Sequence, residues 1–272
     1  MKIVQHRLQG DDGAAVAFER SPNQSGGLAA RYLVMHYTAG SSAAGAIATL
    51  TNPASRASAH LVIARDGAVT QLVPFNRIAW HAGRSRWHDL RGLNAHSIGI
   101  ELDNAGRLER QGSEWRSWFG RAYPSDDVLE AAHKHESRVR GWHLYTVEQL
   151  AVATEVAGVI VEKYGLSDIL GHDDIAPGRK ADPGPAFPMN SFKSAVLGRR
   201  EDADEFHETT AHLNIREGPG TGYEKLAASP LAPGTRLNLE ARDGAWCHVE
   251  VLDANGRPDL TGWVHGNYIR PA

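Results

Sequence analysis

Short apolar runs that alternate with helical segments constrain the fold of this chain more than any other feature of its sequence. Residues 31–37 (RYLVMHY) and 97–102 (SIGIEL) read as buried strands, because each is a short apolar run bounded by polar residues. Residues 58–73 contain two strand-like runs joined by Asp66-Gly67, a dipeptide typical of hairpin turns. With helices between them, these strands predict an α/β fold in which helices flank a mixed sheet.

Two segments have the pattern of helices. Residues 146–165 carry apolar side chains at spacings of three and four, as expected for a helix with one buried face. Thr146 and Gln149 match a capping box at its start, and Gly165 matches a C-terminal stop. Residues 43–51 predict a shorter helix.

The segment 103–145 is polar and rich in Trp, Arg and His. We expect it to form loops around a short helix near residues 125–136. Four of its side chains either rim a groove or anchor a loop: Trp115, Arg116, Trp118 and Arg121.

A change in composition predicts two domains. Residues 1–195 hold the alternating strands and helices, and the charged stretch 196–207 (VLGRREDADEFH) reads as a linker. Residues 208–272 carry short alternating runs with dense turn signals, which predict a small all-β module.

Bulk properties exclude several classes of protein. The net charge of −3 gives no electrostatic case for binding nucleic acid. No stretch reaches the ~18 apolar residues of a membrane span. The N-terminal residues lack the apolar core of a secretory signal, so the compartment is left open between the cell envelope and the cytoplasm. Cys247 is the sole cysteine, which excludes an intrachain disulfide and a cysteine zinc cluster.

The loop 171–184 (GHDDIAPGRKADPG) concentrates reactive side chains between glycines and prolines that restrict its backbone. One interpretation is a solvated turn. The other is a metal site in which His172 and Asp182 are two ligands, because a catalytic zinc takes three protein ligands and keeps one open position. His36, at the end of a strand, is the candidate third ligand, unless it is a histidine satisfied within the core.

Two further residues fit such a centre. Glu101 alternates with Ile98 and Ile100, so it faces the other side of the sheet. It is either a solvated strand carboxylate or a general base beside a metal. Lys180 supplies a positive charge that would stabilise an oxyanion.

Five ordered blocks carry a resemblance to a known family. LVMHYTAG, SAHLVIARDG, AWHAG, SIGIEL and GHDDIAPGRKADPGPAF occur here in the order they have in the type 2 N-acetylmuramoyl-L-alanine amidases. These are zinc enzymes related to AmpD, the bacteriophage T7-type lysozymes and the peptidoglycan recognition proteins. The resemblance covers about residues 30–195. It implies a Zn²⁺ site made by His36, His172 and Asp182, with Glu101 and Lys180 as the catalytic residues.

The same resemblance implies that His60, Trp80 and His81 lie at or along the groove that binds substrate. It also implies the reaction: hydrolysis of the amide between the lactyl group of N-acetylmuramic acid and L-alanine, in peptidoglycan or in soluble muropeptides. No cofactor other than zinc is expected.

The C-terminal module resembles a bacterial SH3 domain, through LNIREGPGTGYEKLAAS and TGWVHGNYIR. Such modules commonly bind cell-wall peptide or glycan, which makes the wall its expected partner; the alternative is a structural cap without a ligand.

Two other classes of protein compete with an amidase. A non-catalytic peptidoglycan-recognition protein would be favoured by a missing ligand, but all three ligands and Glu101 are present. An iron oxygenase with two histidines and one carboxylate would carry an H-x-D pair on one strand. Here His36, His172 and Asp182 follow a different order and spacing.

Overall fold

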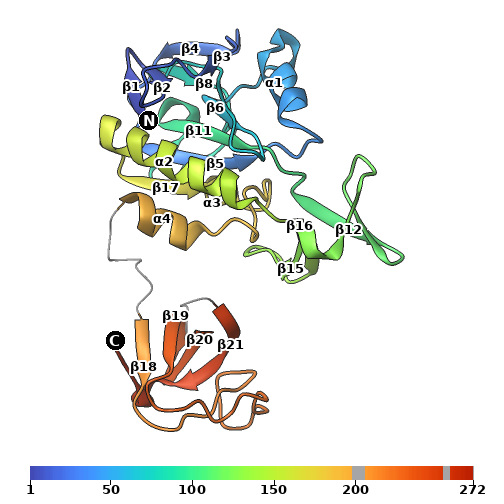
Figure 1. Ribbon diagram of the computed structural model, residues 1–272, viewed down its shortest axis with the longest axis vertical. Helices are drawn as coiled ribbons and strands as arrows, with labels where there is room; N and C mark the ends of the chain where they lie inside the picture. Colours follow the sequence, from blue (N-terminus) through green and yellow to red (C-terminus); the bar gives the residue numbers. More distant parts are fainter. Residues whose placement is uncertain (198–205, 254–257, 272) are drawn as a thin grey trace. The chain divides into compact units, whose positions relative to one another are not determined.

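The structure is a computed structural model that describes residues 1–197, 206–253 and 258–271 (Figure 1). The chain divides into two compact units, Met1–Leu197 and Gly198–Ala272. Most of the predicted linker, residues 198–205, lies outside the described residues.

The centre of the first unit is a six-stranded mixed sheet, which confirms the predicted mixed α/β fold. Its strand order is β17-β5-β11-β6-β7-β3. The neighbours β17, β5, β11 and β6 run parallel, and β6 and β7 are antiparallel. The strands are β3 (Ala17–Phe18), β5 (Tyr32–Tyr37), β6 (Leu61–Ile63), β7 (Val69–Gln71), β11 (Ser97–Leu102) and β17 (Asp168–Gly171).

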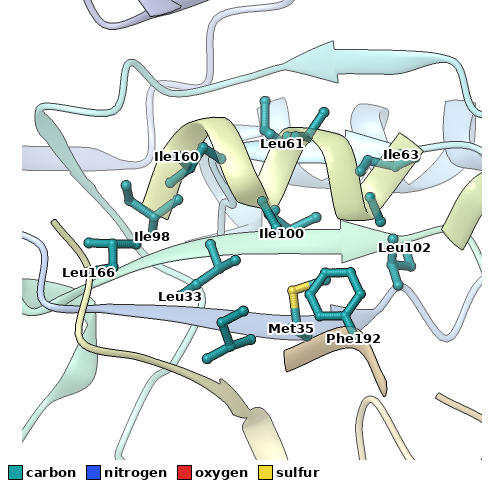
Figure 2. Packing of buried hydrophobic residues seen from close by; sticks show 14 of the residues in the cluster. Leu33, Met35, Leu61, Ile63, Ile98, Ile100, Leu102, Ile160, Leu166 and Phe192 are labelled. Carbon is teal, nitrogen blue, oxygen red and sulfur yellow. The ribbon is translucent and has the colours of Figure 1, made fainter. Parts of the chain in front are cut away.

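Two helices cover one face of this sheet, α2 (Val147–Tyr164) and α4 (Met189–Leu197). Figure 2 shows Ile160 of α2 and Phe192 of α4 near the apolar side chains of the central strands. This face holds most of the core. Each fully buried Leu or Ile in it contributes about 1.5–3 kcal/mol to stability relative to an exposed side chain. The sheet residues in this cluster include Leu33, Met35, Leu61, Ile63, Ile98, Ile100 and Leu102.

The opposite face of the sheet carries two smaller apolar clusters, together with the polar side chains of His36 and Glu101. Helix α1 (Ala43–Thr51) packs Ile47 and Leu50 against Val62 and Leu72. Outside residues 103–145, the small remaining elements of this unit are β1 (Lys2–Val4), β2 (Arg7–Gln9), β4 (Gln24–Gly27), β8 (Arg77–Ala79), β9 (Arg86–Trp87), β10 (Leu90–Arg91), α3 (His172–Ile175) and the 3-10 turns Pro53–Ser55 and Leu93–Ala95.

The helices predicted over residues 43–51 and 146–165 and the hairpin predicted at Asp66-Gly67 are confirmed, with one difference at a cap. Gly67, in the β6–β7 turn, has a φ of +83°. Thr146 accepts a hydrogen bond from the Gln149 amide, and Gly165 ends α2 in the left-handed conformation. The Gln149 side chain does not complete the capping box. It donates instead to the carbonyls of Ile63 and Asp103, joining the helix start to the ends of β6 and β11.

The prediction for residues 103–145 is wrong. The segment forms a five-stranded antiparallel sheet of order β14-β13-β12-β16-β15, and residues 125–136 hold a single 3-10 turn (Ser125–Asp127) followed by a strand. Its strands are β12 (Arg107–Gln111), β13 (Glu114–Arg116), β14 (Ala122–Tyr123), β15 (Val128–Ala132) and β16 (Val139–His143).

A small apolar core stabilises this second sheet, which we call the inserted sheet. Leu108, Trp115 and Tyr123 are buried together, although the strands around them are polar. Trp115 lies flat against Gly141, where a Cβ would come within 2.6 Å of the indole ring. With so few apolar residues per strand, the two-residue alternation is weak, and the pattern resembled loops.

The second unit contains a five-stranded antiparallel sheet of order β21-β20-β19-β18-β22. Its apolar core includes Leu213, Ile215, Leu237, Val249 and Val264. The strands are β18 (Phe206–Thr209), β19 (Arg236–Asp243), β20 (Trp246–Leu252), β21 (Pro258–His265) and β22 (Ile269–Pro271), with a 3-10 turn at Gly266–Tyr268.

Within the residues described, none of the helices has both the length and the apolar character needed to cross a membrane.

Candidate active site

His36 and Glu101 are neighbours across two parallel strands. The register of β5 and β11 pairs Glu101 directly with His36. Because side chains alternate along a strand, both point to the face opposite the one that α2 covers. The alternation inferred from the sequence therefore places Glu101 beside the predicted metal ligand.

His172 and Asp182 reach the same place from the end of β17. His172 begins the short helix α3, directly after the strand ends at Gly171. The chain then returns, and the Asp173 amide donates to the Asp182 carbonyl at 2.8 Å. A Cβ on Gly171 would lie 2.9 Å from the Pro183 ring, so glycine permits this close return.

Three ligand-type atoms converge at this point. His36 Nδ1 and His172 Nδ1 lie 2.9 Å apart. Asp182 Oδ2 lies 2.9 Å from the first nitrogen and 2.8 Å from the second. All three residues are buried, and they form a group of suitable geometry for one metal ion.

The contacts of the Nε2 atoms of His172 and His36 indicate which nitrogen of each ring carries the lone pair. His172 Nε2 lies 3.2 Å from the Ala82 carbonyl, which can only accept, so Nε2 carries the proton and Nδ1 is free to bind a metal. His81 Nε2 faces the Ser97 carbonyl at 3.3 Å in the same way, so His81 Nδ1 is an acceptor. His36 Nε2, 2.9 Å from that Nδ1, is then the donor, which leaves its own Nδ1 unprotonated.

The cluster therefore fits a cation by its chemistry. Two imidazole lone pairs and a carboxylate oxygen face one another within 3 Å in a buried space, an arrangement that is repulsive unless a positive charge lies among them. Burial lowers the pKa of His36 to about 4, which favours the neutral, ligating form. Burial alone would raise the pKa of Asp182, but the neighbouring His172 and His36 rings keep it below its usual range.

Glu101 has the properties of a proton-transfer group. Burial, and then the charge of Asp182, raise its pKa well above 4.5, while Lys180 lowers it. Its Oε2 atom is buried and has no hydrogen-bond partner among the described residues. Lys180 is exposed, and its positive charge also lowers the pKa of His36.

Two clefts adjoin the cluster in the first unit. The hydroxyl cleft has a volume of about 470 Å³ and is lined by Thr38, Ala39, Gly40, Ser41, Ser42, Gly45, Ala46, Thr49, Leu50, Glu101, Trp118 and Phe119. The arginine cleft has a volume of about 530 Å³ and is lined by Tyr37, Ala39, Ala105, Arg107, Glu109, Gln111, Arg116, Ser117, Trp118, Gly120, Arg179, Lys180, Ala181 and Asp182.

None of the three residues predicted to contact substrate lines either cleft. His60 is fully buried: its Nε2 donates to the Arg77 carbonyl, and its Nδ1 accepts from the Gly99 amide. Its burial leaves no ring surface for a substrate. His81 contacts His36 as described, and the Trp80 indole donates to Ser25 Oγ at 3.2 Å.

The inserted sheet supplies cleft residues that the sequence did not identify, chiefly Arg107. The four aromatic and basic side chains singled out in this segment take different places. Trp118 and Arg116 line clefts. Arg121 anchors a loop by donating to the Ser41 carbonyl, and Trp115 is buried. The alternating pattern of Arg107–Gln111 was the sequence signal from which this strand, and so this part of the arginine cleft, could have been predicted.

The part of the chain that contains this site matches a known protein family. The sequence model of the family Amidase_2, described as N-acetylmuramoyl-L-alanine amidase, matches residues 26–185. The chain belongs to this amidase family. The matched range contains all the residues of the cluster, Glu101 and Lys180.

Similar members of the amidase family come from Escherichia coli K12. The chain is 31% identical over 182 residues to N-acetylmuramoyl-L-alanine amidase AmiD, an alignment that covers 64% of this chain and 55% of AmiD. It is 33% identical over 143 residues to 1,6-anhydro-N-acetylmuramyl-L-alanine amidase AmpD, covering 52% of this chain and 59% of AmpD. The chain thus spans little more than half the length of these curated relatives.

Solved structures of amidases are also similar. A selenomethionine derivative of AmpD aligns with a TM-score of 0.49 and 26% identity over 72% of this chain and 99% of that one. E. coli AmiD in complex with the substrate anhydro-N-acetylmuramic acid-L-Ala-D-γ-Glu-L-Lys aligns with a TM-score of 0.48 and 29% identity over 63% of this chain and 59% of that one.

Proposed function

We propose that this chain is a zinc-dependent N-acetylmuramoyl-L-alanine amidase that hydrolyses the lactyl–L-alanine amide of peptidoglycan or muropeptides. The observation that carries the proposal is the buried group of His36 Nδ1, His172 Nδ1 and Asp182 Oδ2, set beside Glu101 within a chain of the amidase family. His36, His172 and Asp182 are the proposed ligands.

Zinc bound by these three residues would act as a Lewis acid and would lower the pKa of water towards 7. The remaining chemistry belongs to the chain. Glu101 takes the proton from the attacking water, and its carboxyl group then gives that proton to the departing amine of L-alanine. The buried Oε2 atom of Glu101, which has no hydrogen-bond partner in the described part of the chain, and the raised pKa of Glu101 support this role.

Lys180 is proposed to stabilise the oxyanion that forms on the attacked carbonyl. It lines the arginine cleft next to Asp182, and its charge acts on both Glu101 and His36. A fixed positive charge is most effective where negative charge develops in the transition state. For His60 and His81, burial supports a structural role beside the cluster in place of contact with substrate.

We further propose that residues 208–272 are a bacterial SH3-like domain that binds the cell wall, joined by the linker 196–207 to an amidase domain of residues 1–195. The ends of this linker belong to regular elements, because α4 ends at Leu197 and β18 begins at Phe206. The antiparallel sheet with its own apolar core supports the first part. A cleft of about 450 Å³ lined in part by Trp246, His265 and Tyr268 supports the second, because aromatic side chains are common in ligand pockets.

Product analysis by mass spectrometry tests the reaction. Incubation with a muramoyl peptide should release the intact stem peptide with a free L-alanine amine, and no product should form after chelation. Intact sacculi and soluble anhydro-muropeptides are compared in parallel. Binding of either substrate without cleavage by zinc-loaded protein would instead identify a recognition protein.

A further inference from the structure

The turn between β15 and β16 of the inserted sheet lies against α3, the short helix that begins with the proposed ligand His172. His133 Nε2 lies 3.0 Å from Asp173 Oδ2, and Lys134 Nζ lies 2.9 Å from Asp173 Oδ1. His135 Nε2 lies 3.1 Å from the Asp173 carbonyl oxygen. Three consecutive side chains of the inserted sheet therefore hold the residue that directly follows a ligand.

The contact between His133 and Asp173 is buried on both sides. The His135 amide donates to His133 Nδ1 at 3.2 Å, so Nε2 carries the proton of the neutral ring and donates it to Asp173. The two residues are only 4% and 3% exposed. A buried carboxylate is costly unless it is paired. Among the residues that the structure describes, the side-chain partners of this carboxylate are His133 and Lys134, so Asp173 depends on the inserted sheet.

Asp173 also connects His172 to Asp182, the other proposed ligand of this loop. The Asp173 amide donates to the Asp182 carbonyl at 2.8 Å, so the position of Asp173 affects how the chain returns after α3. Strand β16 packs on the same return, because a Cβ at Gly184 would come within 2.8 Å of the buried Trp142 ring. A shift of the inserted sheet would therefore reach the segments of both ligands.

The segment after His36, the third proposed ligand, contacts the same sheet. The Trp118 indole donates to the Ala39 carbonyl at 2.7 Å, and Arg121 Nη1 donates to the Ser41 carbonyl at 3.1 Å. Both carbonyls belong to the loop that follows β5, the strand that carries His36. The inserted sheet thus contacts the chain next to each of the three proposed ligands.

We propose that the inserted sheet positions the metal ligands, and that His133 is its main positioning residue, acting on His172 through the carboxylate of Asp173. This inference rests on the proposed function, because it concerns the zinc site of that function. Attachment of the sheet alone would not require a buried carboxylate beside a ligand. Because His172 and Asp173 share the first turn of α3, a displaced Asp173 moves His172 as well.

The test is made on the full chain with two measurements: zinc affinity, by competition with a chromogenic chelator, and the visible absorption of the cobalt(II)-substituted protein, which reports ligand geometry. His133→Ala should lower zinc affinity by about 10–100-fold, as loss of an outer partner of a metal site commonly does, and should change the cobalt spectrum. His133→Gln keeps an N–H donor and should recover most of the affinity. Adding Asp173→Ala to His133→Ala should lower affinity no further, because His133 acts through Asp173.

Glu130→Ala is the matched control. Glu130 is on the same strand, β15, and its exposed side chain lies 3.6 Å from that of Arg110. This variant should keep the zinc affinity and the cobalt spectrum of the wild-type protein. If metal-free His133→Ala melts at a lower temperature but keeps both properties, the sheet only stabilises the fold and the proposal is overturned. Zinc affinity that depends on His133, in a protein that cleaves no muramoyl peptide, would instead reject the proposed amidase function and leave the positioning role standing.

Discussion

His36 Nε2 lies 2.9 Å from His81 Nδ1, and this contact determines which nitrogen of His36 is available to a metal. His81→Ala should therefore lower zinc affinity by about 10–100-fold, the usual cost of removing a partner of a ligand. The measurement is competition with a chromogenic chelator. His88→Ala, at an exposed histidine of the same unit, is the control and should bind zinc normally. Unchanged affinity in His81→Ala would show that His36 needs no acceptor at Nε2.

Gly99→Ala should disturb the same contact from the other side. A Cβ at Gly99 would lie 2.4 Å from the His81 ring, so the ring must move away from His36. We expect a lower melting temperature together with weaker zinc binding. Gly158→Ala is the matched control: its added Cβ meets nothing within 4 Å, and in helix α2 the change should be neutral or stabilising by about 0.4–1 kcal/mol. Normal zinc binding in Gly99→Ala would contradict this account.

Substitutions at Asp182 and Glu101 should affect metal binding and proton transfer separately. Asp182→Ala should lose zinc, because it removes the one oxygen donor of the cluster. Glu101→Gln should retain zinc and lose turnover by about 10²–10⁴-fold, the range typical of a general acid–base group. Zinc content is measured by elemental analysis and turnover by release of stem peptide. Loss of zinc from Glu101→Gln would make Glu101 a ligand.

Lys180→Ala should shift the pH profile in a defined direction. Glu101 must be ionised to accept a proton, so kcat rises with pH through its pKa. The Lys180 charge lowers that pKa, and its removal should move the acid limb of kcat to higher pH. Lys180→Arg keeps the charge and should keep the limb in place. A limb that stays where it is in Lys180→Ala would mean that Glu101 is not the group that titrates.

The second unit should govern binding to the wall and not the chemistry. Protein ending at Leu197 should cleave soluble muropeptides at a normal rate but sediment less with insoluble sacculi. Trp246→Ala in the full chain should weaken sedimentation in the same way, because Trp246 lines the cleft of that unit. Trp118→Ala, in the first unit, serves as the comparison and should reduce cleavage of soluble substrate. Sacculus binding that is unaffected by both truncation and Trp246→Ala would exclude an anchoring role.

Local patterns predicted the central sheet and its main helices well. The run SIGIEL has strict alternation, so the side of the sheet that Glu101 faces could be read from its position relative to Ile98 and Ile100. The capped pattern of residues 146–165 likewise predicted α2. The inserted sheet was not recognised, because its apolar positions are single residues such as Leu108 and Trp115 within polar strands.

By itself, the sequence determined the elements and the ligand-type residues, because strand alternation, helix caps and the glycines and prolines of residues 171–184 act over a few neighbouring positions. Tertiary structure decided which distant groups meet. The pairing of β5 with β11 sets His36 beside Glu101, and packing between elements buries His60 and His81. The bond from Trp118 to Ala39 joins residues 79 positions apart. Such contacts depend on packing between elements, which no local pattern encodes.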